Sequence, residues 1–189
     1  LNYAEVLLDK KPVGKSVALI GAGGIGIDTA EFLAHEGVSS SENVNQYMNE
    51  WGVDMDIHSR GGLKEQSKQN PAREIFLLKR SIGKHGKGLG KTTGWIHRAS
   101  LRMKNVKMFS NVSYEKIDDE GLHISIKDKK MLLPVDHIVI CAGQESLDYL
   151  YTGLKEKGKS VHLIGGAKEA AELDAKRAIY DAAHLAAKL

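Results

Sequence analysis

The residues best suited to chemistry form a glycine-rich turn near the start of the chain. Residues 21–26 read Gly-Ala-Gly-Gly-Ile-Gly and match the pattern G-x-G-x-x-G. The apolar run at 17–20 predicts a buried strand before this turn, and the periodicity of 25–35 predicts a helix after it. In that setting the pattern is typical of a turn that binds the pyrophosphate of a dinucleotide.

Each glycine of this turn has its own task in such a site. Gly21 permits the tight turn, Gly23 lets a pyrophosphate approach the backbone, and Gly26 lets the helix lie close on the strand. The helix N-terminus supplies free N–H groups and a positive dipole end, so Gly24 and Ile25 are also predicted cofactor-binding positions. The alternative is a tight strand-to-helix turn without a ligand.

Two further side chains lie near the predicted sheet. Asp28 lies close to the start of the first helix, where a carboxylate favours the helix dipole or helps to orient a cofactor. Cys141 lies in an apolar strand and is predicted to be inert core. The eight histidines show no metal-ligand spacing, so no metal site is expected.

Basic side chains are concentrated in one part of the chain. The formal net charge is only +3, yet residues 79–107 contain no Asp or Glu. A one-sign cluster indicates a phosphorylated small molecule or a nucleic acid as partner, or simply a solvated basic face. Nucleic acid is disfavoured because Trp95 is the single aromatic residue available for stacking. The cluster consists of Lys79, Arg80, Lys84, Lys87, Lys91, Arg98, Arg102, Lys104 and Lys107.

The end of the second predicted strand indicates which dinucleotide binds. NAD sites usually carry Asp or Glu there for the ribose hydroxyls. This strand, at 74–78, is instead followed by Lys79 and Arg80, with Lys84 beyond, and Arg and Lys pair with a 2′-phosphate. The sequence therefore predicts NADP(H). More residues than usual separate this strand from the glycine turn, because residues 38–71 form an insertion.

The remaining elements complete an α/β pattern. Strand and helix alternate, a three-strand meander follows, and then another strand, so we predict a Rossmann-like parallel sheet flanked by helices with a small antiparallel β-meander. In the predicted helix at 93–104, Trp95, Ile96, Ala99 and Leu101 are expected on the inner side. The other predictions are a helix near 42–51, a turn at 61–62, strands at 106–109, 114–117, 122–126, 131–135, 138–142 and 161–164, and a long helix at 167–189.

Composition places the chain among ordinary globular proteins. It has 189 residues, 42% of them hydrophobic and 27% charged. A single cysteine excludes a disulfide framework and any cysteine-based zinc or iron–sulfur site within this chain. No apolar run is long enough for a membrane span, and the first residues lack the pattern of a signal peptide, so we expect a cytoplasmic protein without a membrane partner. The absence of an initial Met suggests a fragment of a longer protein.

Several segments together resemble a known family. They are residues 13–30 around the glycine turn, 88–98 (Gly-Leu-Gly-Lys-Thr-Thr-Gly-Trp-Ile-His-Arg), 119–124, and 165–167 with 172–179. They resemble the C-terminal region of bacterial NADPH-dependent 2,4-dienoyl-CoA reductase, a flavoprotein of the old-yellow-enzyme and trimethylamine-dehydrogenase type. That family joins a barrel holding FMN and a 4Fe-4S cluster to FAD- and NADPH-binding domains. The resemblance implies that electrons pass from NADPH to FAD, through the cluster to FMN, and on to the dienoyl-CoA of unsaturated fatty acid β-oxidation.

The resemblance also implies how this chain is divided. Residues 1–143 correspond to the NADP(H)-binding domain, and 144–189 to a strand and helix of an incomplete FAD-binding domain. The barrel with its catalytic residues, the cluster cysteines and the family's FAD glycine motif are absent from this sequence. We therefore expect no catalytic residue here and no FAD, FMN or 4Fe-4S cluster held by this chain alone, its partners being NADP(H) and the remaining FAD and barrel domains.

Further cofactor-binding positions follow from the same resemblance. Ala142 and Gly143 end the strand that returns the chain toward the FAD domain. Gly166 and Ala167 form the turn that faces the flavin, where many such proteins have Gly-Asp. Within the segment 88–98, Lys91 and Thr92 are expected to contact the nucleotide.

Two other functions remain open on the sequence. One is the domain of a trimethylamine-dehydrogenase-like amine dehydrogenase that holds ADP only as structure. Lys79 and Arg80 argue against it, because ADP has no 2′-phosphate. The other is a non-catalytic nucleotide-sensing module. A comparison of NADPH and NADH affinities distinguishes the reductase from both.

Overall fold

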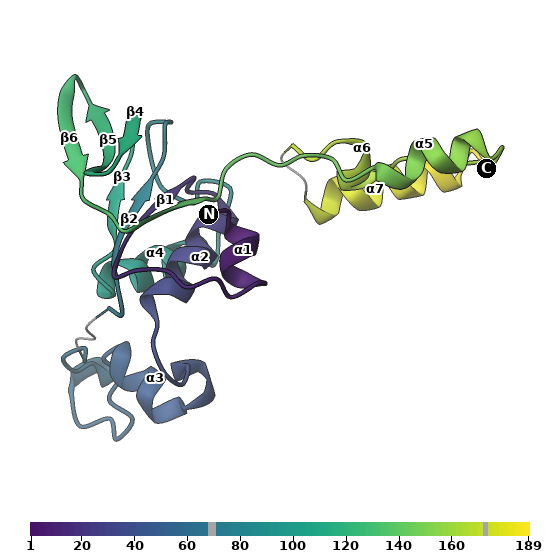
Figure 1. The fold of residues 1–189 in the computed structure, drawn as a ribbon. Helices are drawn as coiled ribbons and strands as arrows, with labels where there is room; N and C mark the ends of the chain where they lie inside the picture. The colour runs from purple at the N-terminus through teal and green to yellow at the C-terminus, as the bar shows by residue number, and fades with distance from the viewer. Residues whose placement is uncertain (68–70, 172–173) are drawn as a thin grey trace. The chain divides into compact units, whose positions relative to one another are not determined.

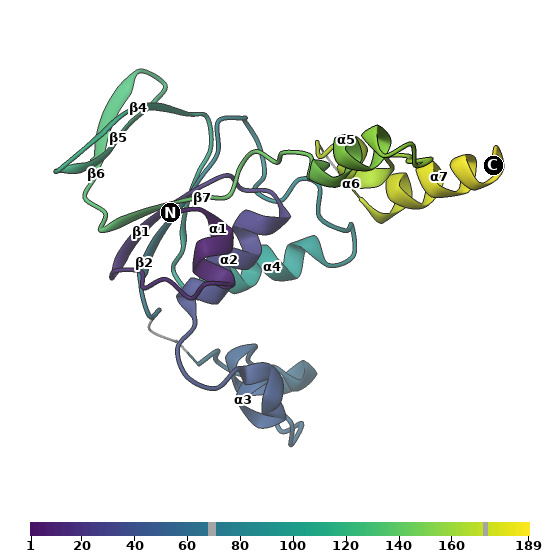
Figure 2. The same cartoon turned by 45° about the vertical axis from the view of Figure 1, so that its right-hand side comes forward.

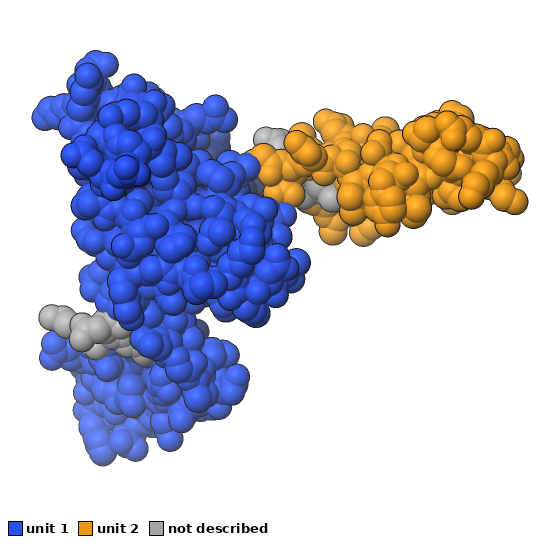
Figure 3. All heavy atoms as spheres, in the orientation of Figure 1, with its two compact units in different colours: residues 1–142 blue, residues 143–189 orange. Residues whose placement is uncertain are grey.

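The computed structural model describes residues 1–67, 71–171 and 174–189. Contacts divide the chain into two compact units, Leu1–Ala142 and Gly143–Leu189 (Figure 3). Among the described residues no helix combines the length and the apolar character that a membrane span requires. Residues 68–70 of the predicted insertion and residues 172–173 of the family segment at 172–179 lie outside the described residues.

A four-stranded parallel sheet forms the centre of the first unit (Figure 1). Its order is β3-β2-β1-β7, formed by β1 (Ser16–Ile20), β2 (Glu74–Leu78), β3 (Lys107–Phe109) and β7 (His137–Ile140). Val17 of β1 lies opposite Ile75 of β2 and His137 of β7. The central strands are apolar at successive positions because both faces of a parallel sheet are covered.

Helices cover one face of this sheet, and a second sheet covers the other. Val17 and Leu19 pack with Ile27 of α2 (Gly24–Ala34) and Leu101 of α4 (Gly94–Met103). Ala18, on the opposite face, packs in a separate core with residues of the antiparallel sheet. That sheet has the order β4-β5-β6, formed by β4 (Val112–Asp118), β5 (Gly121–Ile126) and β6 (Lys129–Leu133) (Figure 2). The predicted α/β class with a small meander is confirmed.

The insertion forms its own small helical segment. It holds η1 (Ser40–Glu42), α3 (Val44–Glu50) and η2 (Arg60–Gly62), so the helix expected near 42–51 is present. Gly61 and Gly62 have φ values of 71° and 65°, as the predicted turn requires. A short N-terminal helix, α1 (Tyr3–Leu7), was not predicted; Asn2 and Glu5 close it with a capping box.

Trp95 was predicted on the inner side of its helix, and this is wrong. Its side chain is 56% exposed, whereas Leu101 is fully buried. The Trp95 ring lies edge-on to Trp51 of the insertion, with 6.2 Å between the ring centroids. The apolar residues of α4 therefore serve two contacts: Leu101 packs on the sheet, and Trp95 packs on the insertion.

The second unit differs from its prediction in two respects. Residues 161–164 form no strand, and the expected long helix is divided into α6 (Gly165–Lys168) and α7 (Ala175–Ala186). Asp174 caps α7 by accepting the Arg177 N–H at 2.7 Å, and Glu169 has extended backbone, so the helix cannot be continuous. The described part of this unit contains no other strand with which 161–164 could pair. It also contains α5 (Tyr149–Glu156).

Candidate functional site

The turn between β1 (Ser16–Ile20) and α2 is so tight that the packing of neighbouring backbone requires glycine at two of its positions. Gly21 has a φ of 113°, and a Cβ atom there would lie 2.8 Å from the backbone carbon of Cys141 and 2.9 Å from Ala142. At Gly26 a Cβ atom would lie 1.8 Å from the carbonyl oxygen of Gly21. These two glycines therefore allow α2 to rest on the ends of β1 and β7.

Gly23 and Gly24 differ, because no protein atom would meet a Cβ at either position within 4 Å. Gly23 is the N-cap of α2, and no side chain caps the helix there. Both residues are exposed, so the N-terminus of α2 faces open space. Internal packing does not explain these glycines, whereas the approach of a ligand to the backbone does.

The loop at 79–90, which follows β2, is fastened to this turn and to the sheet. The Gly86 N–H donates to the carbonyl oxygen of Ala22 at 2.8 Å, and Lys79 Nζ donates to the carbonyl oxygen of Lys84 at 2.8 Å. His85 is 7% exposed. Its Nε2 atom lies 3.1 Å from the Leu77 carbonyl oxygen and 3.0 Å from that of Phe109. Because both partners only accept, Nε2 must carry the hydrogen.

Burial lowers the pKa of His85, and the positive charge of Lys79 lowers it further, although the two carbonyl oxygens partly oppose this shift. The unfolded chain then binds a proton near pH 6.5 that the folded chain does not yet bind. We therefore predict that the free energy of unfolding falls as pH drops through about 6.5. Denaturant titrations at several pH values measure it. The decline should be shallower in His85→Gln, and equal slopes would contradict this.

Basic side chains gather beside this loop in a pocket of about 420 Å³. Arg98 and Arg102 lie one helical turn apart on α4, a spacing at which like charges repel. No acidic side chain lines the pocket, and neither arginine has an ion pair among the described residues. The unbalanced charge favours a bound anion. The lining consists of Lys84, His85, Trp95, Arg98, Arg102 and Met108.

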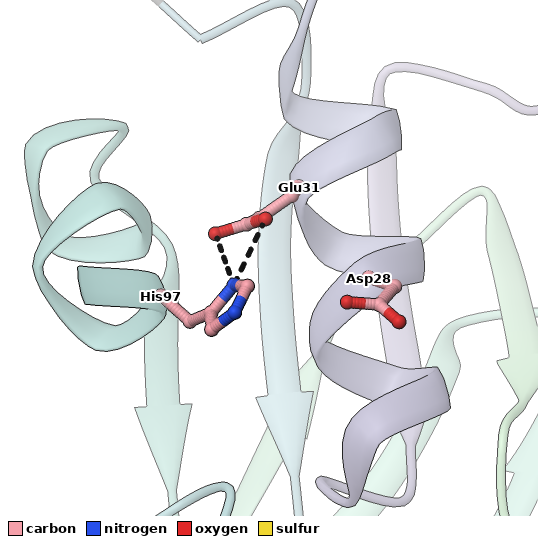
Figure 4. Close-up of side chains that lie close together, drawn as sticks. All are labelled: Asp28, Glu31 and His97. Carbon is pink, nitrogen blue, oxygen red and sulfur yellow. Dashed lines mark hydrogen bonds and ion pairs between the residues drawn. The ribbon is translucent and has the colours of Figure 1, made fainter. Parts of the chain in front are cut away.

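An interaction between helices fixes α4 next to α2. His97 Nδ1 lies 3.4 Å from both carboxylate oxygens of Glu31 (Figure 4). Asp28 lies one turn earlier on α2 and is exposed, and its carboxylate comes within 4.8 Å of the other two groups. The contact between His97 and Glu31 itself explains why these groups are close, and it holds the arginines of α4 in place relative to the glycine turn.

The structure brings some of the predicted site residues together and leaves others apart. Ala142 lies against Gly21, the first residue of the turn that also contains Gly23, Gly24 and Ile25. Arg80 is exposed and has no ion pair among the described residues; its charge partly offsets the rise that burial causes in the pKa of Tyr114. Lys91 and Thr92 are exposed in the turn that precedes α4. Gly143, Gly166 and Ala167 belong to the second unit, where Gly166 and Ala167 lie in α6.

Sequence reasoning missed His85 and the role of Arg102. His85 lies in a glycine- and lysine-rich loop, and nothing in that composition signals a buried imidazole. Arg102 was counted only as part of the basic cluster. Its spacing of four residues from Arg98 was the available signal, because it places both side chains on one face of the helix. Cys141 is buried as predicted, and burial raises the pKa of its thiol.

Comparison with known proteins gives relatives that are much longer than this chain. No family model matches the sequence. A metal reductase of Desulforamulus reducens is 25% identical over 184 residues, which cover 96% of this chain and 25% of that protein. The chain thus spans about a quarter of the length of this relative.

Solved structures share the fold of this chain. A 2-naphthoyl-CoA reductase in complex with 2-naphthoyl-CoA has a TM-score of 0.66 at 23% identity, covering 96% of this chain and 22% of that one. Histamine dehydrogenase from Rhizobium sp. 4-9 has a TM-score of 0.68 at 17% identity, covering 100% and 26%. An amine oxidase acting on 6-hydroxypseudooxynicotine from Pseudomonas geniculata N1 has a TM-score of 0.64 at 18% identity, covering 96% and 23%. By their names these proteins are oxidoreductases.

Proposed function

We propose that this chain is the NADP(H)-binding part of a multidomain flavin-dependent reductase. The observation that carries the proposal is the open backbone at Gly23 and Gly24 in a unit that also holds an unbalanced basic pocket. Its relative in Desulforamulus reducens, a reductase about four times as long, is consistent with a module of a larger enzyme.

The residues present fit NADP(H) at both of its phosphate groups, the pyrophosphate and the 2′-phosphate. The pyrophosphate would lie at the start of α2, where Gly23 and Gly24 leave space and the helix supplies N–H donors. The 2′-phosphate would be paired by Arg80 at the end of β2 and by Lys84 of the basic pocket. Trp95, which also lines that pocket and is exposed, offers a ring on which adenine can stack.

Bound NADPH supplies a hydride. This chain's own residues bind the cofactor and orient it. The glycine turn fixes the pyrophosphate, and the loop at residues 79–90, the basic loop, fixes the phosphorylated ribose. The proposal needs no nucleophile or general acid among the described residues of this turn. The group that accepts the hydride would belong to another part of the parent protein. This division of work is what an NADP(H) module requires.

At a finer level we propose that the parent protein reduces a 2,4-dienoyl-CoA. The support is the resemblance of segments 13–30 and 88–98 to that reductase family. FAD, FMN and a 4Fe-4S cluster would be held by the rest of the parent chain, with Gly166 and Ala167 near the flavin. We propose that the protein is cytoplasmic. Its one cysteine is buried and free, and disulfides are typical of oxidising compartments.

Titration calorimetry with NADPH, NADH and ADP tests the proposal on the purified chain. Pairing of the 2′-phosphate should make NADPH bind about 30- to 1000-fold more tightly than NADH, which corresponds to roughly 2–4 kcal/mol. Equal affinities for NADPH and NADH would reject the proposal, and preferred binding of ADP would favour the structural domain of an amine dehydrogenase. Sequencing the upstream gene region then distinguishes a reductase from a sensing module, because the reductase requires a barrel with a cluster of cysteines.

A further inference from the structure

We infer that His85 is a positioning residue that sets the preference for NADPH by holding the basic loop in its binding conformation. The inference rests on the proposed function. The imidazole Nε2 is already engaged by the carbonyl oxygens of Leu77 and Phe109, so it is not free to bind a cofactor. Its effect would reach the cofactor through the neighbouring Lys84.

Few buried groups hold this loop. Lys79 Nζ donates to the Lys84 carbonyl oxygen, and the half-buried Leu89 packs against the core. Within residues 79–90, all of which are described, only His85 and Gly86 are buried. Gly83 and Gly86, on either side of His85, have φ values of 101° and 62°, which glycine adopts freely and other residues rarely adopt. A segment of this composition loses much conformational entropy when it is ordered.

The imidazole joins this loop to two strands at once. Leu77 belongs to β2 and Phe109 to β3, and the ring bridges their carbonyl oxygens. On the other side of the loop, the Gly86 N–H reaches the glycine turn through Ala22. His85 and Gly86 therefore connect the sheet, the basic loop and the turn, and Lys84 precedes this fixed pair directly.

The basic groups around Lys84 explain why the position must be fixed. Lys84 shares its pocket with Arg98 and Arg102, and the His85 carbonyl oxygen lies 3.5 Å from Arg98 Nη1. Like charges in one pocket would separate if the loop were free to move. A preorganised loop avoids the entropy of ordering it when the phosphate binds, and this raises affinity for the phosphorylated cofactor specifically.

The geometry defines which side chains can replace histidine. A glutamine amide nitrogen reaches approximately as far as Nε2 and can donate two hydrogen bonds, whereas an asparagine amide ends near the position of Nδ1. His85→Gln should therefore keep both carbonyl partners, and His85→Asn should lose them. The two variants carry the same functional group and differ by one methylene.

The test compares NADPH and NADH affinities of the unaltered chain, His85→Gln and His85→Asn, with His58→Asn in the exposed insertion as a control. The ratio of the two affinities does not depend on the fraction of folded protein. We expect His85→Asn to reduce the preference about tenfold and His85→Gln to stay within about threefold of the unaltered chain. Hydrogen exchange of residues 83–87 without nucleotide should accelerate in the asparagine variant alone.

The possible results distinguish a failure of the proposed function from a failure of the inference about His85. An unaltered chain that shows no preference for NADPH overturns the proposed function, and the inference with it. A chain that prefers NADPH, with the same preference in His85→Asn, overturns the inference alone. Equal losses in the glutamine and asparagine variants also overturn it, because they would show that the two hydrogen bonds are not what matters.

Discussion

Replacing Gly23 by valine is expected to reduce NADPH affinity at least about 100-fold while the chain stays folded. A Cβ atom at this position meets no protein atom within 4 Å, and the backbone φ of −79° is accessible to valine. The branched side chain instead occupies the space that a pyrophosphate needs above the helix N-terminus. Calorimetric titration measures the affinity, and circular dichroism melting checks the fold.

Gly26→Ala is the matched control, because it changes the same turn with the opposite expectation. The added methyl group would lie 1.8 Å from the Gly21 carbonyl oxygen, so α2 must shift away from the sheet. We expect a loss of several kcal/mol in the free energy of unfolding. Unchanged NADPH affinity in Gly23→Val would remove the turn from the binding site, and a stability loss equal to that of Gly26→Ala would show that Gly23 is structural.

The sheet was predictable because its strands carry their own signal. Residues 17–20 and 75–78 are apolar at every position, a pattern that indicates a strand covered on both faces. The three antiparallel strands are separated by short polar turns, so their order follows from the sequence. The glycine turn was predictable for a similar reason, since its spacing and its neighbours point to one geometry.

The errors arose where a residue's environment is supplied by a distant segment. Trp95 has the spacing of a core residue, but it packs against Trp51 of the insertion, and nothing local distinguishes the two contacts. The helix break between α6 and α7 has instead a local cause, the cap at Asp174, which the alanine-rich sequence around it obscured. His85 is buried by two strand ends that lie 8 and 24 residues away in sequence.

The basic residues that follow β2 lead to the second prediction, which concerns the preference for NADPH over NADH. We expect Arg80→Ala to weaken NADPH binding tenfold or more and to leave NADH binding nearly unchanged. Arg80 follows the strand where the adenosine ribose of a Rossmann ligand lies, and its planar guanidinium can form two hydrogen bonds to one phosphate. It is exposed and unpaired by any acid in the described chain, so its charge remains available.

Two comparisons decide what this variant means. Lys87→Ala removes an equal charge from an exposed position in the same loop that does not line the basic pocket, so it should change NADPH affinity less than about threefold. Arg102→Ala removes a charge that does line it. All titrations need one fixed salt concentration, because phosphate pairing is screened. If Arg80→Ala weakens NADPH and NADH equally, Arg80 does not read the 2′-phosphate. If Arg102→Ala alone lowers the preference, the phosphate lies in the pocket of α4 rather than at the end of β2, and the second strand is not what selects the cofactor.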